Sequence, residues 1–231
     1  MTNWGFRVFP LNQRPPKHVV NQFESIVTPH ISDNMNRMDA FSALLRPYHR
    51  EGKLVGTALT VRSRPGDNLM AHKAIEMAEP GDVIVVDAGG DLTNAIIGEI
   101  MVRIAIKKGI AGFVIDGAIR DTEAIKAGAF PVYARGVTHR GPYKDGPGEI
   151  NVPVSIGGMV VNPGDIIVGD DDGLIAVPAG DAERILALAK LQQAKETAIF
   201  QTIEDGTIDR KWIDETLKSK GCEFVERTDN L

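Results

Sequence analysis

The chain has 231 residues, of which 43% are hydrophobic and 25% charged, and its formal net charge is −5. Such a chain can bury a sizeable core, and its scattered Lys and Arg argue against a nucleic-acid partner, which would need a basic stripe. The single Cys222 excludes an internal disulfide framework and suits a reducing compartment. We find no apolar stretch long enough to span a membrane and no signal peptide, and therefore expect a cytoplasmic protein without a membrane partner.

The first part of the chain is expected to hold an arm, two helices and a strand. Residues 1–16 read as an irregular arm ending in Pro15-Pro16. The segment KHVVNQFESIV that follows has apolar residues at helical spacing and is expected to stop at Thr28-Pro29, with a short helix after Ser32. From Leu54, the run LVGTALTVR is rich in β-branched residues and predicts a strand.

Helices and buried strands alternate from residue 65 to residue 136. Two Pro-Gly-Asp turns, at Pro65 and Pro80, precede the helix NLMAHKAIEMA and the strand VIVVD, which is apolar enough to be buried on both faces. The next helix contains MVRIAIKK and ends before Gly109. Then come the strand FVID, the short helix DTEAIKAG and the strand PVYARG. This alternation predicts a mixed α/β fold.

The pattern changes after residue 152. Short strands split by Gly, Pro and Asp run to residue 177, a long helix is expected from Asp181 to about Ile203, and the last 25 residues predict a further helix and a tail. We therefore expect layered sheets with helices outside. The predicted division is one domain over residues 1–205, including the N-terminal arm, and a C-terminal helical tail over 206–231.

Polar residues follow two of the predicted buried strands. VIVVD is followed by Gly89-Gly90, and FVID is followed by Gly117 and then by Arg120-Asp121. Ligands of open α/β sheets bind just beyond the carboxyl ends of parallel strands. Arg120 and Asp121 are therefore candidates for chemistry, although the pair could equally start a helix with Asp121 as its N-cap.

The segment around Gly98 offers a second candidate feature. If a helix begins there, the free N–H groups of its first turn, on Gly98, Glu99, Ile100 and Met101, could hold a carboxylate. Periodicity equally allows a helix from Leu92, which would use those groups in its own hydrogen bonds. Together with an arginine for a keto oxygen and two acids for a divalent cation, such a turn would form a coherent site, and oxygen-rich ligands suit Mg²⁺ or Mn²⁺.

Other motifs are weaker or absent. The five histidines show no spacing typical of a zinc site, and neither Gly-x-Ser-x-Gly nor GxGxxG occurs. The run Asp170-Asp171-Asp172-Gly173 lacks the spacing of a calcium-binding EF-hand and predicts an acidic turn. His139-Arg140 could border a site, but a polar loop explains it as well.

Several motifs together resemble a known family. These are GDNLMAHKAI, PGDVIVVDAGGD, a Gly-Glu pair followed by GIAGFVIDGAIRD, PVYARG and PGDIIVGDDDGLIAVP. They resemble the RraA-like family, which contains the 4-hydroxy-4-methyl-2-oxoglutarate / 4-carboxy-4-hydroxy-2-oxoadipate aldolases, over roughly residues 25–200. The most specific feature is an acid separated by 20 residues from Arg-Asp, here Glu99 and Arg120-Asp121. The family often has Asp at the first place, and Glu99 is one methylene longer.

The resemblance implies a fold and a metal site. The fold would be a layered α-β-β-α sandwich of the swivelling β/β/α type. Asp121 would ligate Mg²⁺ or another divalent cation such as Mn²⁺ directly, and Glu99 would hold it through water. A glutamate on the C-terminal helix of a neighbouring subunit would complete the metal shell, and Glu196 is the candidate, although it could be merely a solvated helix residue. The assembly would be a homotrimer or a homohexamer.

The same resemblance implies a substrate site and an activity. Arg120 would bind the keto oxygen of pyruvate, the turn Gly98 to Met101 (with Glu99 and Ile100) its carboxylate, and Asn68 would line the pocket. The expected activity is class II, metal-dependent cleavage of 4-hydroxy-2-oxo acids to pyruvate and a keto acid, as in the catabolism of aromatic compounds, with decarboxylation of oxaloacetate. The family also contains a non-catalytic inhibitor of ribonuclease E, which is the alternative, and an enzyme for another 2-oxo acid is a third possibility.

Overall fold

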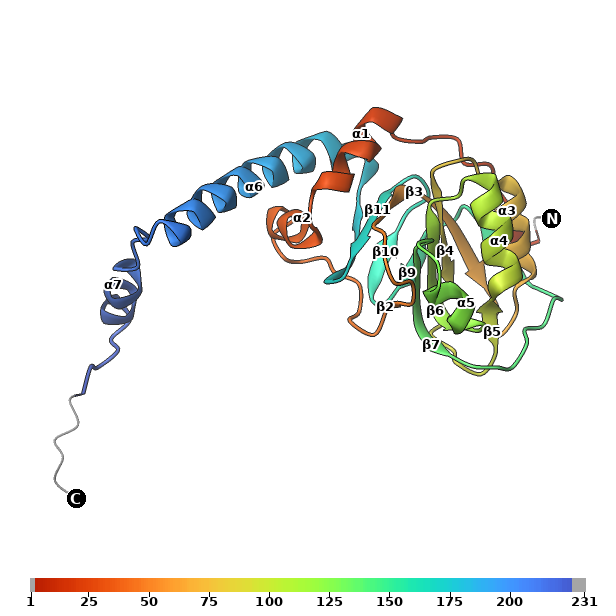
Figure 1. The fold of residues 1–231 in the computed structure, drawn as a ribbon. Coiled ribbons are helices and arrows are strands. Elements are labelled where there is room, and N and C mark those ends of the chain that lie inside the picture. The colour runs from red at the N-terminus through yellow and green to blue at the C-terminus, as the bar shows by residue number, and fades with distance from the viewer. Residues whose placement is uncertain (1–2, 226–231) are drawn as a thin grey trace, which may run out of the picture. The chain divides into compact units, whose positions relative to one another are not determined.

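The computed structural model of the protein describes residues 3–225 and has a mixed α/β fold built on one large sheet (Figure 1). The main path of this ten-stranded sheet runs β1-β8-β3-β4-β6-β7-β2, while β5 pairs with β6, and β11 and β12 branch from β3. Its strands are β1 (Phe6–Val8), β2 (Arg46–Pro47), β3 (Leu54–Ser63), β4 (Asp82–Asp87), β5 (Ala95–Ile97), β6 (Gly112–Ile119), β7 (Val132–Val137), β8 (Gly148–Ile150), β11 (Ile166–Asp170) and β12 (Gly173–Val177).

Helices and strands cover opposite faces of the central strands β3, β4 and β6. Helix α3 (Leu69–Met77) follows β3 along the chain. Helix α4 (Glu99–Lys108) follows β4 and β5, and α5 (Thr122–Lys126) follows β6. They lie together beside the sheet in Figure 1. On β4 the side chains alternate, so that Ile84 and Val86 belong to the core beneath α3 and α4, whereas Val83 and Val85 belong to a second core.

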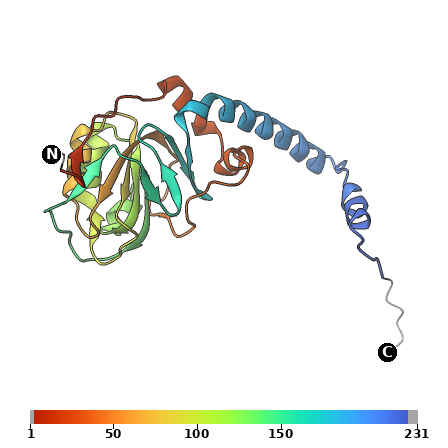
Figure 2. The ribbon, with the colours of Figure 1, turned by 180° about the vertical axis from the view of Figure 1, so that it is seen from behind.

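The second core is covered by further strands and by the N-terminal helices. It contains side chains from α1 (Lys17–Gln22), the 3-10 turn η1 (Phe23–Ser25), α2 (Thr28–Asn34), β11 and β12, and from the hairpin of β9 (Val154–Ile156) and β10 (Met159–Val161). Figure 2 shows these elements from the other side. The layers are therefore helices, sheet, strands and helices, which confirms the expected fold class.

Most of the predicted elements are present, and two predictions about the N-terminal region are wrong. The arm over residues 1–16 is not wholly irregular, because β1 pairs in parallel with β8. The short helix expected after Ser32 is α2, which already begins at Thr28 and has Pro29 in its first turn. Proline is tolerated there because the first-turn N–H groups have no intrahelical acceptor.

The described chain divides into two compact units by its contacts. The first reaches Lys190 and contains the sheet, and the second begins at Leu191. The long helix α6 (Ala182–Glu204), which follows the 3-10 turn η2 (Ala179–Asp181), spans this boundary, and α7 (Trp212–Ser219) lies in the second unit. The predicted division at 205/206 into a catalytic domain and a tail stays a prediction. Among residues 3–225, no helix is long and apolar enough to cross a membrane.

Candidate active site

Helix α4 begins immediately after Gly98, which settles its start in favour of the first of the two sequence alternatives. Residues 95–97 are strand β5 rather than helix, because Ala95 and Ile97 pair with β6. The backbone N–H of Arg120 also donates to the carbonyl of Ile97 at 3.1 Å. Gly98 is the N-cap, in an extended conformation, and its carbonyl accepts the first helical bond from Val102. The first turn of α4 is thus placed at the carboxyl end of the short strand β5.

Asp121 occupies the N-cap position of α5 but does not cap that helix with its side chain. Its backbone has a φ of +58°, in the left-handed region, which Asp tolerates better than most residues. Its carboxylate oxygen Oδ2 instead accepts a hydrogen bond from the backbone N–H of Glu99 at 2.9 Å. Asp121 therefore joins the end of β6 to the start of α4. The alternative interpretation, in which its side chain caps α5, is not what the structure shows.

Gly98 leaves no room for a side chain at this junction. A Cβ atom added to it would lie 2.4 Å from Asp121 Oδ2, 3.0 Å from Arg120 Cγ and 3.2 Å from Arg120 Nε. Arg120 and Asp121 are themselves adjacent, with 3.8 Å between Arg120 Nε and Asp121 Oδ2. Both side chains therefore pack directly against the backbone of Gly98. The φ of Gly98 is available to any residue, so glycine is needed here because a side chain would not fit.

These residues border a cavity of about 130 Å³. Of the substrate-binding and metal residues expected from the sequence, Asn68, Gly98, Ile100, Met101, Arg120 and Asp121 line it. The remaining lining residues are His72, Ala95, Ile96, Ile97, Pro142 and Lys144. The cavity thus has an apolar wall from β5 and α4, and polar groups from α3, from the end of β6 and from the segment after β7.

Asn68 is the most buried polar residue of this lining, with 3% of its surface exposed. Its side-chain amide donates to the carbonyl of Ile96 at 2.8 Å and lies 3.5 Å from the sulfur of Met101. Its oxygen Oδ1 is buried and accepts no hydrogen bond from the described residues. A buried acceptor without a donor costs about 1–3 kcal/mol, so an unpaired oxygen in a cavity wall indicates a place where a ligand would bind.

Glu99 and Glu196 are placed differently from the other predicted residues. The carboxylate of Glu99 does not line the cavity and accepts hydrogen bonds from Arg103, at 2.8 Å from Nε and 2.5 Å from Nη2. Only its backbone N–H reaches Asp121. Glu196 lies on α6 in the second compact unit and accepts a hydrogen bond from Gln192 at 3.1 Å. The metal-binding roles of both residues stay predictions.

His72 and Lys144 line the cavity and were not among the residues predicted from the sequence. His72 lies one helical turn after Asn68 and its N–H donates to the carbonyl of Asn68, so the spacing i, i+4 could have placed it on the same face. The sequence analysis looked only for pairs of histidines at the spacing of zinc ligands, and such a search does not identify a single histidine in a cavity wall. Lys144 lies between β7 and β8, where no periodic pattern locates a side chain.

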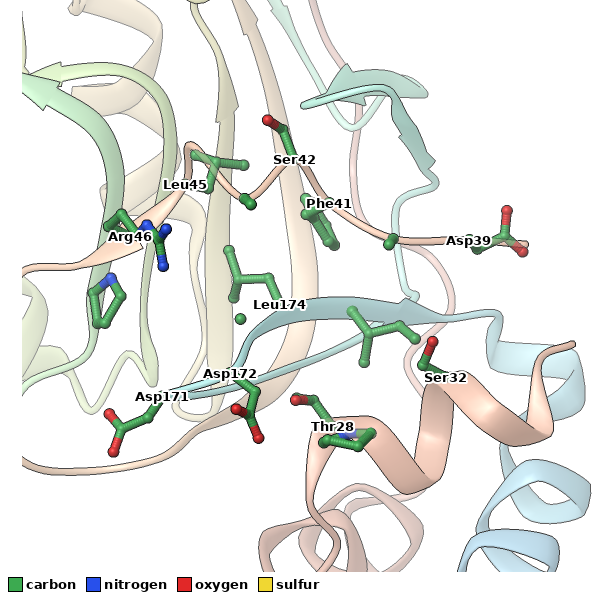
Figure 3. Close-up of a pocket in the computed structure, with 16 residues that line it drawn as sticks. Thr28, Ser32, Asp39, Phe41, Ser42, Leu45, Arg46, Asp171, Asp172 and Leu174 are labelled. Atoms are coloured by element: carbon green, nitrogen blue, oxygen red, sulfur yellow. The ribbon is translucent and has the colours of Figure 1, made fainter. Parts of the chain in front are cut away.

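A second cavity, of about 210 Å³, lies between α2, residues 39–47 and the turn from β11 to β12. Figure 3 shows Phe41, Leu45 and Leu174 gathered at its centre, with the carboxylate of Asp39 pointing away. The three apolar side chains belong to the second core. This hollow is larger and also has polar side chains in its lining, among them those of Arg46, Asp171 and Asp172, but none of the site residues expected from the sequence lines it.

Comparison with known proteins places these features in a family context. Residues 28–176 match the family described as RraA-like: Aldolase/RraA. A protein of Halalkalibacterium halodurans with the provisional name 4-hydroxy-4-methyl-2-oxoglutarate aldolase is 45% identical over 189 residues, which cover 82% of this chain and 90% of the relative. The 4-hydroxy-4-methyl-2-oxoglutarate aldolase of Thermus thermophilus is 33% identical, and the match covers 65% of this chain and 92% of that protein.

Similar solved structures bear other names. The RNA-processing inhibitor RraA from Thermus thermophilus superposes with a TM-score of 0.62 at 33% identity, and the match covers 66% of this chain and 92% of that chain. Similar proteins therefore carry both an enzyme's name and an inhibitor's name, and the choice between them depends on the cavity.

Proposed function

The chain belongs to the RraA-like family, and from this premise we propose that it is a lyase that cleaves 4-hydroxy-2-oxo acids, such as 4-hydroxy-4-methyl-2-oxoglutarate, to pyruvate and a second keto acid. The observation that carries the proposal is the junction at Gly98. It brings the side chains of Arg120 and Asp121 and the first turn of α4 to one cavity. A cation and a helix start suit an anionic 2-oxo acid, although the Glu99 N–H of that turn already donates to the Asp121 carboxylate.

The residues of the cavity fit a divalent cation. Asp121 contributes a carboxylate to the lining, and Asn68, another lining residue, has a buried oxygen without a donor among the described residues. Such oxygen donors suit Mg²⁺ or Mn²⁺, and Mg²⁺ commonly keeps several waters and uses only one or two carboxylates. Within residues 3–225, no three His, Cys, Asp or Glu side chains are grouped around a metal position. In this proposal Asp121 is the direct ligand, and Glu99, whose carboxylate accepts hydrogen bonds from Arg103 and does not line the cavity, would have to leave Arg103 to act through water.

The chain's own residues then account for most of the catalytic demands. In retro-aldol cleavage a general base takes the proton of the C4 hydroxyl group, the C4 carbonyl forms as the C3–C4 bond breaks, and the electron pair of that bond develops as negative charge on the C2 oxygen. A proton then returns to C3 and gives pyruvate. Arg120 would stabilise this charge, and the first turn of α4 would orient the neighbouring carboxylate. A bound divalent cation supplies additional positive charge for the same oxygen. Decarboxylation of oxaloacetate gives the same pyruvate enolate and should be a side activity.

A closed oligomer, a trimer or a pair of stacked trimers, forms part of the proposal. The second compact unit carries large apolar side chains that are half or more exposed, including Leu191 at 61%, Phe200 at 59% and Trp212 at 62%. Apolar groups of this size are usually covered by a partner surface. In the assembly we propose, Glu196 of one subunit completes the metal shell of its neighbour, and each site needs two chains.

The test of the function is pyruvate release. Purified protein with Mg²⁺ is given oxaloacetate and a panel of 4-hydroxy-2-oxo acids, with and without a chelator, and pyruvate is measured by a coupled assay. We expect turnover that the chelator abolishes and added Mg²⁺ or Mn²⁺ restores. Absence of pyruvate from every substrate would contradict the proposal, and turnover that resists chelation would contradict the metal.

Inhibition of ribonuclease E is the alternative, and the name of the solved Thermus structure, an RNA-processing inhibitor, supports it. It is distinguished by adding the protein to an RNA cleavage assay with purified ribonuclease E. The aldolase proposal expects no change in RNA cleavage. Inhibition that persists in a variant lacking the Asp121 carboxylate would assign this chain to the inhibitor class.

A further inference from the structure

The start of helix α3 departs from the usual arrangement at a helix N-terminus. Asn68 occupies the N-cap position of α3, but its side chain makes no capping hydrogen bond. Asparagine is among the residues that most favour this position, because its side-chain oxygen accepts from the N–H groups of the first turn. Here the amide of Asn68 lies in the wall of the candidate active site, and its nitrogen donates to the carbonyl of Ile96 at 2.8 Å.

The residue before Asn68 takes over part of the capping. Asp67 is fully buried, and its oxygen Oδ1 accepts from the backbone N–H of Leu69, the first residue of α3, at 2.9 Å. This bond satisfies one of the donors that the first turn of a helix leaves without an intrahelical partner. With that donor served by Asp67, the oxygen of Asn68 can stay in the cavity wall, where it is buried without a donor among the described residues.

The other oxygen of Asp67 fixes the segment that holds the backbone of Asn68. Its Oδ2 accepts from the backbone N–H groups of Asp145 at 2.7 Å and Gly146 at 2.9 Å. In the same segment, the carbonyl of Tyr143 accepts the backbone N–H of Asn68 at 3.0 Å. The carboxylate therefore holds Asn68 from two directions, through the first turn of α3 and through the segment between β7 and β8.

We propose that Asp67 is a positioning residue of the candidate active site, which keeps the side-chain amide of Asn68 in the cavity wall by relieving it of the capping of α3. This inference rests on the proposed function, in which the unpaired oxygen of Asn68 faces a ligand of the cavity. Asp67 itself does not line the cavity. It therefore acts through Asn68 and not by touching a ligand.

The side-chain amide of Asn68 can serve either the cavity wall or the start of α3, and the carboxylate of Asp67 decides between them. In the structure the amide keeps its bond to Ile96, and a rotation toward α3 would break that bond. Removal of the carboxylate leaves the N–H of Leu69 and the donors of the neighbouring segment without this acceptor. Because donors without acceptors are costly, the oxygen of Asn68 then gains more at the helix start than in the cavity wall.

The experiment compares two buried aspartates that differ in their relation to the cavity. Asp165 is buried and accepts from the backbone N–H groups of Asn162 at 2.8 Å and Ala179 at 3.4 Å, but it does not line the cavity or contact a residue that does so. Asp67→Ala and Asp165→Ala should both lower Tm, by about 5 °C or more. Only Asp67→Ala should also lower kcat/KM for pyruvate release, by about tenfold to 100-fold, the scale of a misplaced group in an active site.

A double-mutant cycle shows whether Asp67 acts through Asn68. If it does, Asp67→Ala should cost little once the amide is gone, and the double variant should stay within about threefold of Asn68→Ala. Losses that multiply, or an Asp67→Ala variant as active as Asp165→Ala, would overturn the proposal. Should Asp67→Ala not fold, Asp67→Ser gives the same cycle with smaller losses, because a serine hydroxyl can still accept from the N–H of Leu69.

Two measurements that need no turnover separate this proposal from the proposed function. Calorimetry with Mg²⁺ follows the binding of oxalate, which has the shape and charge of the pyruvate enolate, and a crystal structure of the Asp67 variant shows where the Asn68 amide points. We expect oxalate to bind about tenfold more weakly to Asp67→Ala than to Asp165→Ala. In the crystal, the Asn68 oxygen should accept from the N–H of Met70 or Ala71.

The outcomes of these measurements are distinct. A parent that releases no pyruvate but binds oxalate in an Asp67-dependent way would refute the function and leave the positioning role standing. An Asn68 amide that still donates to Ile96 in the crystal structure of the Asp67 variant would overturn the positioning role, whether or not the parent is an aldolase.

Discussion

The backbone N–H of Glu99 donates a hydrogen bond to the carboxylate of Asp121 at 2.9 Å, across 22 positions of the chain. The intervening residues form α4, the turn after it and β6. The spacing is therefore the number of residues that the chain needs to run from the end of β5 through α4 to the end of β6, the strand that pairs with β5. The characteristic spacing between the acid and Arg-Asp therefore has a structural meaning that does not depend on the acid's own side chain. It brings the carboxylate of Asp121 to the start of α4.

Gly98→Ala should disable the site while the fold remains. The added methyl group would lie 2.4 Å from Asp121 Oδ2, so Asp121 and Arg120 must move. We expect kcat/KM to fall by about 100-fold, the scale of a 1 Å misplacement in an active site, at a stability cost of about 1–3 kcal/mol. Gly128→Ala is the control, because its nearest neighbour would be at 3.8 Å. Equal activity of the two variants would show that the junction is not required.

Asp121→Asn should abolish metal-dependent turnover without unfolding the protein. The amide oxygen can still accept from Glu99, and Asn tolerates the left-handed backbone of this residue. Only the charge is lost, so titration with Mn²⁺ should show weaker binding than in the parent. Asp121→Ala should likewise lose turnover and still fold. Glu123→Gln, an exposed acid in the first turn of α5, serves as the control. Unchanged Mg²⁺ dependence in Asp121→Asn would remove Asp121 from the metal site.

Arg120→Lys should be severely impaired although the charge is conserved. Lysine lacks the planar fork that addresses a keto oxygen and a neighbouring carboxylate together. Loss of one positioned donor to a developing oxyanion costs about 10²–10³ in kcat. Arg140→Lys, an exposed arginine of the neighbouring segment, should be near normal in the same pyruvate-release assay. An Arg120→Lys variant within about threefold of the parent would mean that Arg120 acts only as a distant charge.

Glu149→Gln should destabilise the protein at neutral pH and much less in acid. Burial alone would raise the pKa of Glu149, but the hydrogen bond from Arg7 and the charge of Arg62 outweigh it and leave the pKa below its ordinary value of 4.5. The stabilisation is therefore complete above pH 4.5, the unfolded-state value, and is lost as the pH falls through the lower folded-state pKa. We expect a loss on the order of 2 kcal/mol at pH 7.

Chemical denaturation of the parent and Glu149→Gln between pH 7 and pH 3 measures this difference. Glu51→Gln, an exposed acid, is the control and should follow the parent throughout. A difference between Glu149→Gln and the parent that stays constant over the whole range would contradict an ionic contribution from Glu149.

Mixing inactive subunits tests whether a site is shared between chains. Glu196→Ala and Asp121→Ala should each be weakly active. If each site takes Asp121 from one chain and Glu196 from its neighbour, mixed oligomers should regain some sites that carry both native residues. Activity of the parent should also fall on dilution below the association constant. Sedimentation that shows a fully active monomer, or no recovery despite demonstrated subunit exchange, would leave the site to a single chain.

The local elements of this protein could be predicted from the sequence because their signals are local. Apolar runs such as VIVVD lie in strands buried on both faces, and Gly109 ends α4 in a left-handed conformation as expected. The candidate residues Arg120 and Asp121 could also be found, because they follow such a strand in a chain of alternating helices and strands. The sequence thus predicted that Arg120 and Asp121 lie near one edge of the sheet.

Other features were decided only by contacts between distant segments. Periodicity left the start of α4 open, and pairing of Ala95 and Ile97 with β6 settled it, because backbone groups in a ladder cannot also serve a helix. The bond from Glu99 to Asp121 likewise turned a potential N-cap into a residue of the cavity. Lys144 entered the cavity because buried Asp67 holds the segment after β7. The sequence determines the local preferences for turns, strands and helices. Which hydrogen-bond donors pair with which acceptors depends on which distant segments lie side by side in the folded chain.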